Sequence, residues 1–75
     1  MKKPNFIEKL FIKKRMKDYT FMRERALKMS RYVVVDLWNG KFYHTLGREE
    51  VNGFQNFCDH YNYKYIIHEN MLFIL

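Results

Sequence analysis

The chain has 75 residues, with 14 Lys and Arg against 8 Asp and Glu, which gives a formal net charge of +6 at pH 7. A chain of this length forms one domain and buries only about 60% of its unfolded surface, which leaves little room for an enzyme pocket of ordinary size. Its longest uncharged apolar run, Met71 to Leu75, is far too short to cross a bilayer. We therefore expect a single domain, residues 1–75, that is neither a membrane protein nor an enzyme.

Charge is divided unequally along the chain. Residues 1–31 carry a net charge of +8, whereas residues 32–75 carry a net charge of −2. This division predicts a basic N-terminal segment attached to a nearly neutral module. The single cysteine, Cys58, allows no disulfide within the chain, and charges interrupt every apolar stretch near the N-terminus. We therefore expect a soluble, cytoplasmic protein without a secretory signal.

The N-terminal segment has helical character. Neither proline nor glycine occurs between residues 6 and 30. One straight helix there would be about 38 Å long, and it would overhang a module only about 24 Å across. The apolar positions up to Phe11 also point about 150° away from the later ones on a helical projection. We therefore predict one helix over 4–13 and a second over 16–30.

Residues 32–46 predict a β-hairpin, because two runs rich in β-branched and aromatic residues flank Asn39-Gly40. A two-residue turn there would place Trp38 opposite Lys41, close enough for a cation–π contact. Side chains alternate between the two faces of a strand, so one set should share a dry face. That set comprises Val33, Val35, Leu37, Phe42, His44 and Leu46.

The remaining residues predict a helix over 48–61, with two glutamates in its first turn, followed by strand character over 63–75. The helix should bury an apolar face, and Gly53 would let a strand approach it. That face comprises Val51, Phe54, Cys58 and Tyr61. The C-terminal stretch is either a second hairpin turning at residues 68–71 or one bulged strand.

These elements predict an α+β fold: one or two N-terminal helices, then a β-hairpin, a helix and one or two closing strands in a small antiparallel sheet. Residues 1–31 would form the basic helical segment and residues 32–75 a ββαβ(β) module. We expect the helices to cover one face of the sheet.

A helical projection gathers five cations and one aromatic residue in one sector of the N-terminal helices, opposite their apolar positions; Glu24 falls in the same sector, four residues before Lys28. The cations and the aromatic residue are Lys13, Lys14, Lys17, Phe21, Arg25 and Lys28. Lysine and arginine release counterions from phosphates, and an aromatic ring stacks on a base, so this pattern is typical of a nucleic-acid-binding surface. An acidic protein surface and an anionic membrane are the next partners, whereas a charged helix face often serves only solubility.

A second candidate site is an aromatic platform on the sheet, formed by Trp38 and Tyr43 with Tyr63 and Tyr65. Such a platform could stack on bases or bind a protein. The alternative is that these rings pack beneath the N-terminal helices.

The histidines and the cysteine do not predict a metal site or a catalytic site. Cys58 and His60 would point about 200° apart on a helix, and no paired ligand spacing occurs. We expect His44 to be buried, His60 and His68 to be exposed, and Cys58 to pack as a small apolar side chain. No cofactor is expected.

We therefore predict a small non-enzymatic regulator or inhibitor that engages nucleic acid, or the machinery that handles it, through the six residues of the helices. Lys, Phe, Tyr, Asn, Met and Ile make up 38 of the 75 residues, which indicates an A/T-rich genome such as that of a bacteriophage, and the host cytoplasm as its location. The alternative is a protein–protein adaptor or a self-assembling homo-oligomer that uses an open sheet edge or an apolar helix face. That face comprises Phe6, Ile7, Leu10 and Phe11.

Overall fold

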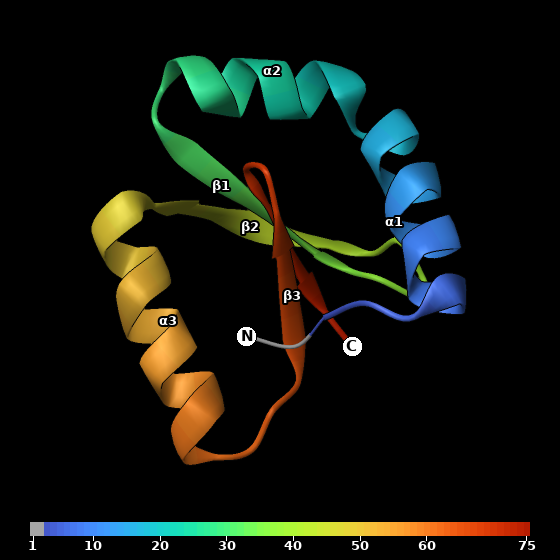
Figure 1. Cartoon of the computed structure of the whole chain (residues 1–75). Coiled ribbons are helices and arrows are strands. Elements are labelled where there is room, and N and C mark those ends of the chain that lie inside the picture. The colour runs from blue at the N-terminus through green and yellow to red at the C-terminus, as the bar shows by residue number, and fades with distance from the viewer. Residues whose placement is uncertain (1–2) are drawn as a thin grey trace.

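The computed structural model describes residues 3–75, which form three helices and a four-stranded sheet and confirm the predicted α+β class (Figure 1). The elements in chain order are α1 (Phe6–Asp18), α2 (Thr20–Lys28), β1 (Arg31–Asp36), β2 (Phe42–Gly47), α3 (Arg48–His60), β3 (Tyr65–His68) and β4 (Met71–Ile74). The C-terminal stretch is therefore a second hairpin, in which Glu69 takes a positive φ of 54° at the turn.

The sheet has the strand order β2-β1-β4-β3. Each hairpin pairs antiparallel, but the two hairpins meet at its centre through β1 and β4, which run parallel. The expected antiparallel pairing therefore holds within the hairpins and not between them. The reason is that α3 carries the chain from β2 at one edge to β3 at the other, and parallel strands need such a crossover.

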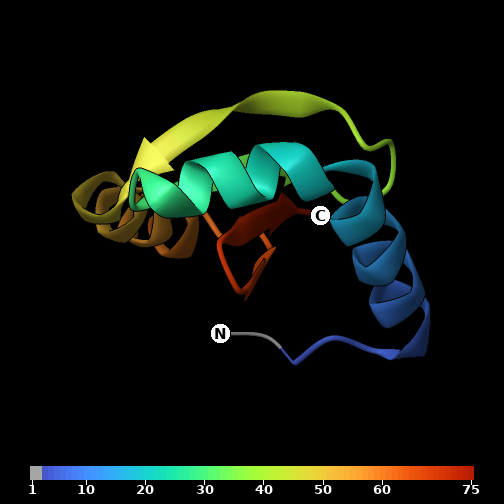
Figure 2. The ribbon, with the colours of Figure 1, turned by 90° about the horizontal axis from the view of Figure 1, so that it is seen from above.

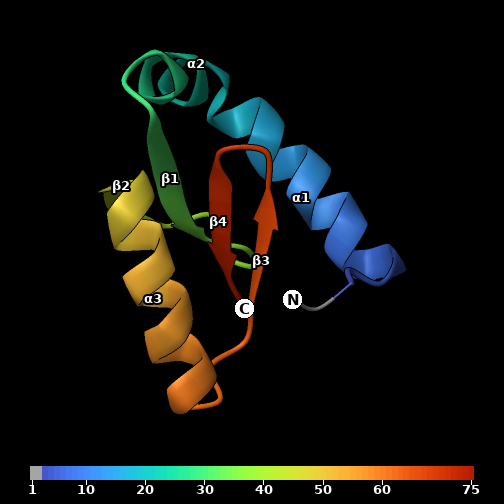
Figure 3. The ribbon, with the colours of Figure 1, turned by 60° about the vertical axis from the view of Figure 1, so that its left-hand side comes forward.

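Both faces of the sheet are covered, with α1 and α2 on one side and α3 on the other (Figure 3). The expectation that the helices cover one face is therefore wrong. Central β1 is buried on both faces, which explains its continuous apolar run. The core toward α1 and α2 comprises Ile12, Ala26, Val33, Val35, Leu37, Ile66, Met71 and Phe73. The core toward α3 comprises Val34, Leu46, Val51, Cys58, Tyr65 and Leu72.

The first hairpin has a longer loop and a different register than predicted. Val34 pairs with His44 and Val35 with Phe42, with a bulge between these two pairs. Leu46 consequently lies on the α3 face, and His44 is exposed rather than buried. Residues that lie opposite each other in an antiparallel pair share a face of the sheet. Because the register differs by one residue from the predicted one, His44 and Leu46 lie on the face opposite to the one predicted for them.

The carboxylate of Asp36 accounts for this loop. Asp36 Oδ1 accepts hydrogen bonds from the backbone N–H groups of Trp38 and Asn39, each at 2.8 Å. Gly40 N donates to Asp36 O at 2.9 Å, and Asp36 N donates to Lys41 O at 2.8 Å. An aspartate that bonds the backbone two residues ahead stabilises a turn of its own, which replaces the two-residue turn.

The N-terminal segment divides at Tyr19, later than predicted, into two helices that meet at a bend (Figure 2). α1 begins with a capping box, in which Asn5 Oδ1 accepts from Glu8 N and Glu8 Oε1 accepts from Asn5 N. At its other end, Thr20 Oγ1 donates to the carbonyls of Met16 and Lys17 at 3.1 and 3.0 Å. These bonds satisfy carbonyl groups at the end of α1.

α3 matches its predicted helix closely. Glu50 Oε1 accepts from Gly47 N at 2.8 Å at the start of the helix. A Cβ placed at Gly53 would meet nothing within 4 Å, so no strand approaches this glycine, contrary to expectation. None of the helices in residues 3–75 has the length and apolar content to cross a membrane.

Candidate nucleic-acid interface

The six residues of the predicted interface are all exposed, three on α1 and three on α2, and together they are called the cationic surface here. They are Lys13, Lys14, Lys17, Phe21, Arg25 and Lys28. The sides of the same helices that face the sheet bury Ile12 and Arg15 on α1 and Ala26 on α2. The helical projection therefore placed these six residues at exposed positions correctly, but Leu27 and Met29, which it put on the apolar side, are exposed as well.

The cations of the cationic surface lie apart from the ion pairs of the protein. In the described part of the chain the ion pairs join Arg15 to Asp18 at 3.2 Å, Arg23 to Glu69 at 3.4 Å and Arg31 to Glu50 at 3.8 Å. None of these arginines belongs to the cationic surface. None of its five cations therefore forms an ion pair with a carboxylate of residues 3–75, although the exposed Glu24 lies next to Arg25 in α2.

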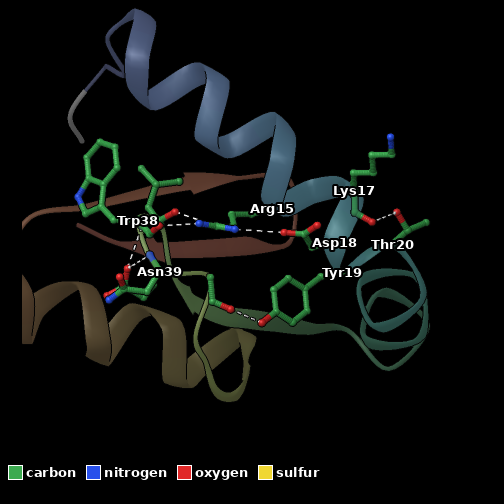
Figure 4. A network of polar contacts seen from close by, with 10 residues as sticks. Arg15, Lys17, Asp18, Tyr19, Thr20, Trp38 and Asn39 are labelled. Atoms are coloured by element: carbon green, nitrogen blue, oxygen red, sulfur yellow. Dashed lines mark hydrogen bonds and ion pairs between the residues drawn. The ribbon is translucent and has the colours of Figure 1, made fainter.

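The bend between α1 and α2 sets the orientation of the two halves of the cationic surface. Thr20 bonds the carbonyl of Lys17, while the Lys17 ammonium points away from the junction (Figure 4). Arg23 Nε adds a hydrogen bond of 3.1 Å to the carbonyl of Met16. Two side-chain donors of α2, the Thr20 hydroxyl and Arg23 Nε, thus tie α2 to the last turn of α1, between the exposed Lys17 and Phe21.

Arg15 anchors α1 to the first hairpin, a role that the sequence analysis missed. Arg15 is 6% exposed, and its side chain donates from Nε to Leu37 O at 2.8 Å and from Nη2 to Trp38 O at 2.6 Å (Figure 4). Tyr19 supports the same loop, because its hydroxyl donates to the carbonyl of Gly40. One signal in the sequence could have found Arg15: it is a cation within the apolar sector of the helical projection.

The structure does not bring Trp38 and Tyr43 together. The Trp38 ring packs edge-on against Phe11 of α1, with the ring centroids 5.0 Å apart. Tyr43 is exposed on β2, and Lys41 Nζ lies 5.5 Å from its ring centroid rather than over Trp38. The predicted Trp38–Lys41 contact is therefore wrong, and Tyr65 is buried under α3 instead of joining a platform.

A different group of aromatic residues is exposed at the end of α3. The ring of Phe57 lies 4.8 Å from that of Tyr61 and 5.8 Å from that of Tyr63, centroid to centroid. All three rings are about half exposed. Tyr61 was predicted on the buried face of the helix, but α3 ends at His60, so Tyr61 leaves the helical path.

The remaining candidate groups are placed individually. His44, His60 and His68 are all exposed, and Cys58 is buried as predicted. Burial raises the pKa of the Cys58 thiol, and the nearby Asp59 carboxylate raises it further. Among residues 3–75 no three histidine, cysteine or acidic side chains gather into a set able to hold a metal ion.

Comparisons with protein-family models, with curated proteins and with solved structures find no match for this chain. Its function is therefore inferred from the charge, exposure and chemistry of its own surface.

Proposed function

We propose that the protein is a small non-enzymatic binding protein that engages nucleic acid through the cationic surface. The observation that carries this proposal is a row of five cations without carboxylate partners in the described chain, next to a Phe21 side chain that is 78% exposed. An apolar ring so far from the core contributes little to folding, whereas it can stack on a base.

The chemistry of the surface fits a phosphate backbone. Each lysine or arginine that neutralises a phosphate releases a counterion, which favours binding at low salt. Phe21 lies between Lys17 and Arg25 along the helices, so a strand following the cations would pass its ring. Stacking of one base on an aromatic side chain contributes about 1–3 kcal/mol and tolerates any sequence.

Such a protein would act by binding to a stretch of nucleic acid and blocking it. A chain of 75 residues that covers a stretch of nucleic acid excludes other proteins from it, which suits a regulator or inhibitor. The bias toward residues with A/T-rich codons supports an origin in a bacteriophage and a role in the host cytoplasm.

The test is binding to duplex DNA and to single-stranded RNA, measured by fluorescence anisotropy over a series of salt concentrations. Contact of all five cations with duplex phosphates gives a slope of log K against log salt of about −4.5. Phe21→Ala should weaken binding to single-stranded RNA more than binding to duplex DNA, because only unpaired bases are free to stack. A salt-insensitive or absent signal would exclude nucleic acid as the partner.

Two double variants separate the cationic surface from net charge. Lys13→Glu with Lys17→Glu removes two phosphate contacts, so the slope on duplex DNA should fall to about −2.7. Lys41→Glu with Lys64→Glu changes the net charge equally at exposed positions outside the surface and should leave the slope near that of the parent. Equal losses in the two variants would show that the attraction is not specific to the cationic surface.

A second candidate function, a protein–protein adaptor, is favoured by one observation. Phe6, Ile7 and Leu10 of α1 are 75%, 57% and 52% exposed, which leaves an apolar patch next to the cations. An acidic protein with an apolar centre would complement both features. Phe11 does not belong to this patch, because its ring packs against Trp38.

Sedimentation distinguishes this second candidate. A protein that self-associates through this patch would form dimers with rising concentration, and Leu10→Glu would abolish them without unfolding the chain, since Leu10 is exposed. If the protein sediments as a monomer at all concentrations, self-association through the patch is excluded, and a different protein is the remaining partner. The open edges of the sheet, β2 and β3, offer a second route to self-association, which Leu10→Glu would leave intact.

A further inference from the structure

A cavity of about 420 Å³ lies where α2, the start of β1, the start of α3 and the turn between β3 and β4 meet. Its wall includes three arginines: Arg23 from α2, Arg31 from β1 and Arg48 from α3. None of its lining residues belongs to the cationic surface, so the cavity is a separate feature. Its volume lies within the usual range of small-molecule sites.

The arginines keep donors available for a ligand. The side chain of Arg48 is exposed and forms no hydrogen bond or ion pair within residues 3–75. Arg31 uses Nε and Nη2 to hold Thr45, and Arg23 uses Nε to hold Met16 O. A guanidinium has five N–H donors, so Arg23 and Arg31 are held in place by part of their donors while the rest stay available.

The carboxylates that meet these arginines form only long ion pairs with them, although Glu50 Oε1 itself is fixed by its hydrogen bond from Gly47 N. Glu69 lies 3.4 Å from Arg23 Nη1, and Glu50 lies 3.8 Å from Arg31 Nη2. Both distances exceed the 2.7–2.9 Å that is typical of a strong charge-assisted hydrogen bond. A dianion with three oxygens can bond several guanidinium groups at once, so it would displace these exposed carboxylates.

The rest of the lining is mixed: it includes the exposed carboxylate of Glu24 as well as apolar surface that suits an organic group. The half-buried ring of Tyr32 and the exposed side chain of Leu27 supply apolar surface. Asn70 lines the same cavity with a side chain fixed through Nδ2, which donates to Arg23 O at 2.9 Å. The cavity is also much larger than an inorganic phosphate requires.

We propose that this cavity binds a phosphomonoester attached to an organic group of about mononucleotide size. The phosphate would lie among the three arginines, and the organic group would lie against Tyr32 and Leu27. The same chemistry is present in a free nucleoside monophosphate and in the 5′-phosphate end of a nucleic-acid strand. The proposal does not depend on nucleic-acid binding by the cationic surface.

The test is an NMR titration of the full chain, labelled with ¹⁵N, with adenosine 5′-monophosphate, adenosine and inorganic phosphate. The monophosphate should shift the amide signals of residues that line the cavity, and inorganic phosphate should shift the same signals with weaker affinity. Adenosine at the same concentrations should shift none of them. Equal shifts with adenosine, or shifts by the monophosphate only outside the cavity, would overturn the proposal.

Three variants with different expected effects on monophosphate binding make the test more specific. Arg48→Gln removes an exposed guanidinium without structural contacts and should weaken monophosphate binding about tenfold. Glu69→Gln removes the carboxylate that competes for Arg23 and should strengthen binding by up to about fivefold. Arg25→Gln, on the outer side of α2, is the matched control and should change nothing. Failure of Arg48→Gln to weaken binding, or equal weakening by Arg25→Gln, would contradict the assignment.

A further experiment distinguishes a free nucleotide from the 5′-phosphate end of a strand as the ligand. A short oligonucleotide with a 5′-phosphate is compared with the same oligonucleotide without it, which cancels any binding to the cationic surface. Tighter binding of the phosphorylated strand that Arg48→Gln abolishes assigns the cavity to strand ends. Equal binding of both strands, with the monophosphate still bound, assigns it to a free nucleotide.

Discussion

The guanidinium of Arg15 lies so close to Gly40 that a Cβ built on Gly40 would be 2.7 Å from Arg15 Nη1. Gly40 also has a φ of +71°, a backbone conformation that side chains with a Cβ rarely adopt. The same guanidinium bonds the carbonyls of Leu37 and Trp38. The loop after β1 therefore closes over a charged side chain of α1, and this contact needs a residue without a Cβ.

Gly40→Ala should lower the free energy of unfolding by about 1–3 kcal/mol, because it combines backbone strain with displacement of Arg15. Urea denaturation followed by circular dichroism measures the change. An unchanged midpoint would mean that the loop and Arg15 move apart at little cost.

Gly53→Ala is the matched control and should have the opposite sign. Gly53 is exposed in the middle of α3, and a Cβ there would meet nothing within 4 Å. Alanine favours a helix over glycine by up to about 1 kcal/mol, so the free energy of unfolding should rise. A loss of stability in the same urea assay would indicate a contact at Gly53 that the structure does not contain.

Thr20→Val should weaken the junction between α1 and α2. Valine has the shape of threonine but no hydroxyl, so the carbonyls of Met16 and Lys17 lose a donor. We expect a loss of about 0.5–1.5 kcal/mol in the free energy of unfolding. Nucleic-acid affinity, measured by anisotropy, should also fall although no charge changes.

Thr20→Ser keeps the hydroxyl and is the control for this junction. Its stability and affinity should remain near those of the parent. If Thr20→Val retained full affinity, the relative orientation of the two helices would have no part in binding.

The stability of the protein should decrease in alkaline solution. Burial raises the pKa of Cys58 above 9.0 and that of Tyr65 above 10.0, and Asp59 raises both further. The unfolded chain therefore loses these protons at lower pH than the native chain does. The free energy of unfolding is unaffected by these groups below about pH 9 and falls as the pH rises above it.

Urea denaturation at a series of pH values from neutral to alkaline measures this decrease. Cys58→Ala should remove the part that begins near the ordinary thiol pKa and leave the part due to Tyr65. The intact protein should also react slowly with a thiol reagent at neutral pH, because Cys58 is 2% exposed. Fast modification of the folded protein would contradict the burial of this side chain.

Local sequence patterns were sufficient to predict the elements of the fold and the outer sides of its N-terminal helices. The helix over 48–61, the hairpin character of 32–46 and the exposure of the cationic surface follow from periodicity and turn residues within short windows. These signals depend on neighbours along the chain, so they need no knowledge of distant contacts.

Tertiary contacts decided the rest. Arg15 of α1 and Tyr19 at its C-terminal end reach across to the loop of the first hairpin and fix it there. The Asp36 carboxylate adds local bonds to the backbone of the same loop. The parallel pairing of β1 with β4, the burial of both sheet faces and the arginine-lined cavity join segments that are distant in sequence. Periodicity shows which side of a helix or strand is apolar, but it does not show which other element packs against that side. The partner is decided only in the folded chain, because the burial of each side chain depends on all the elements together.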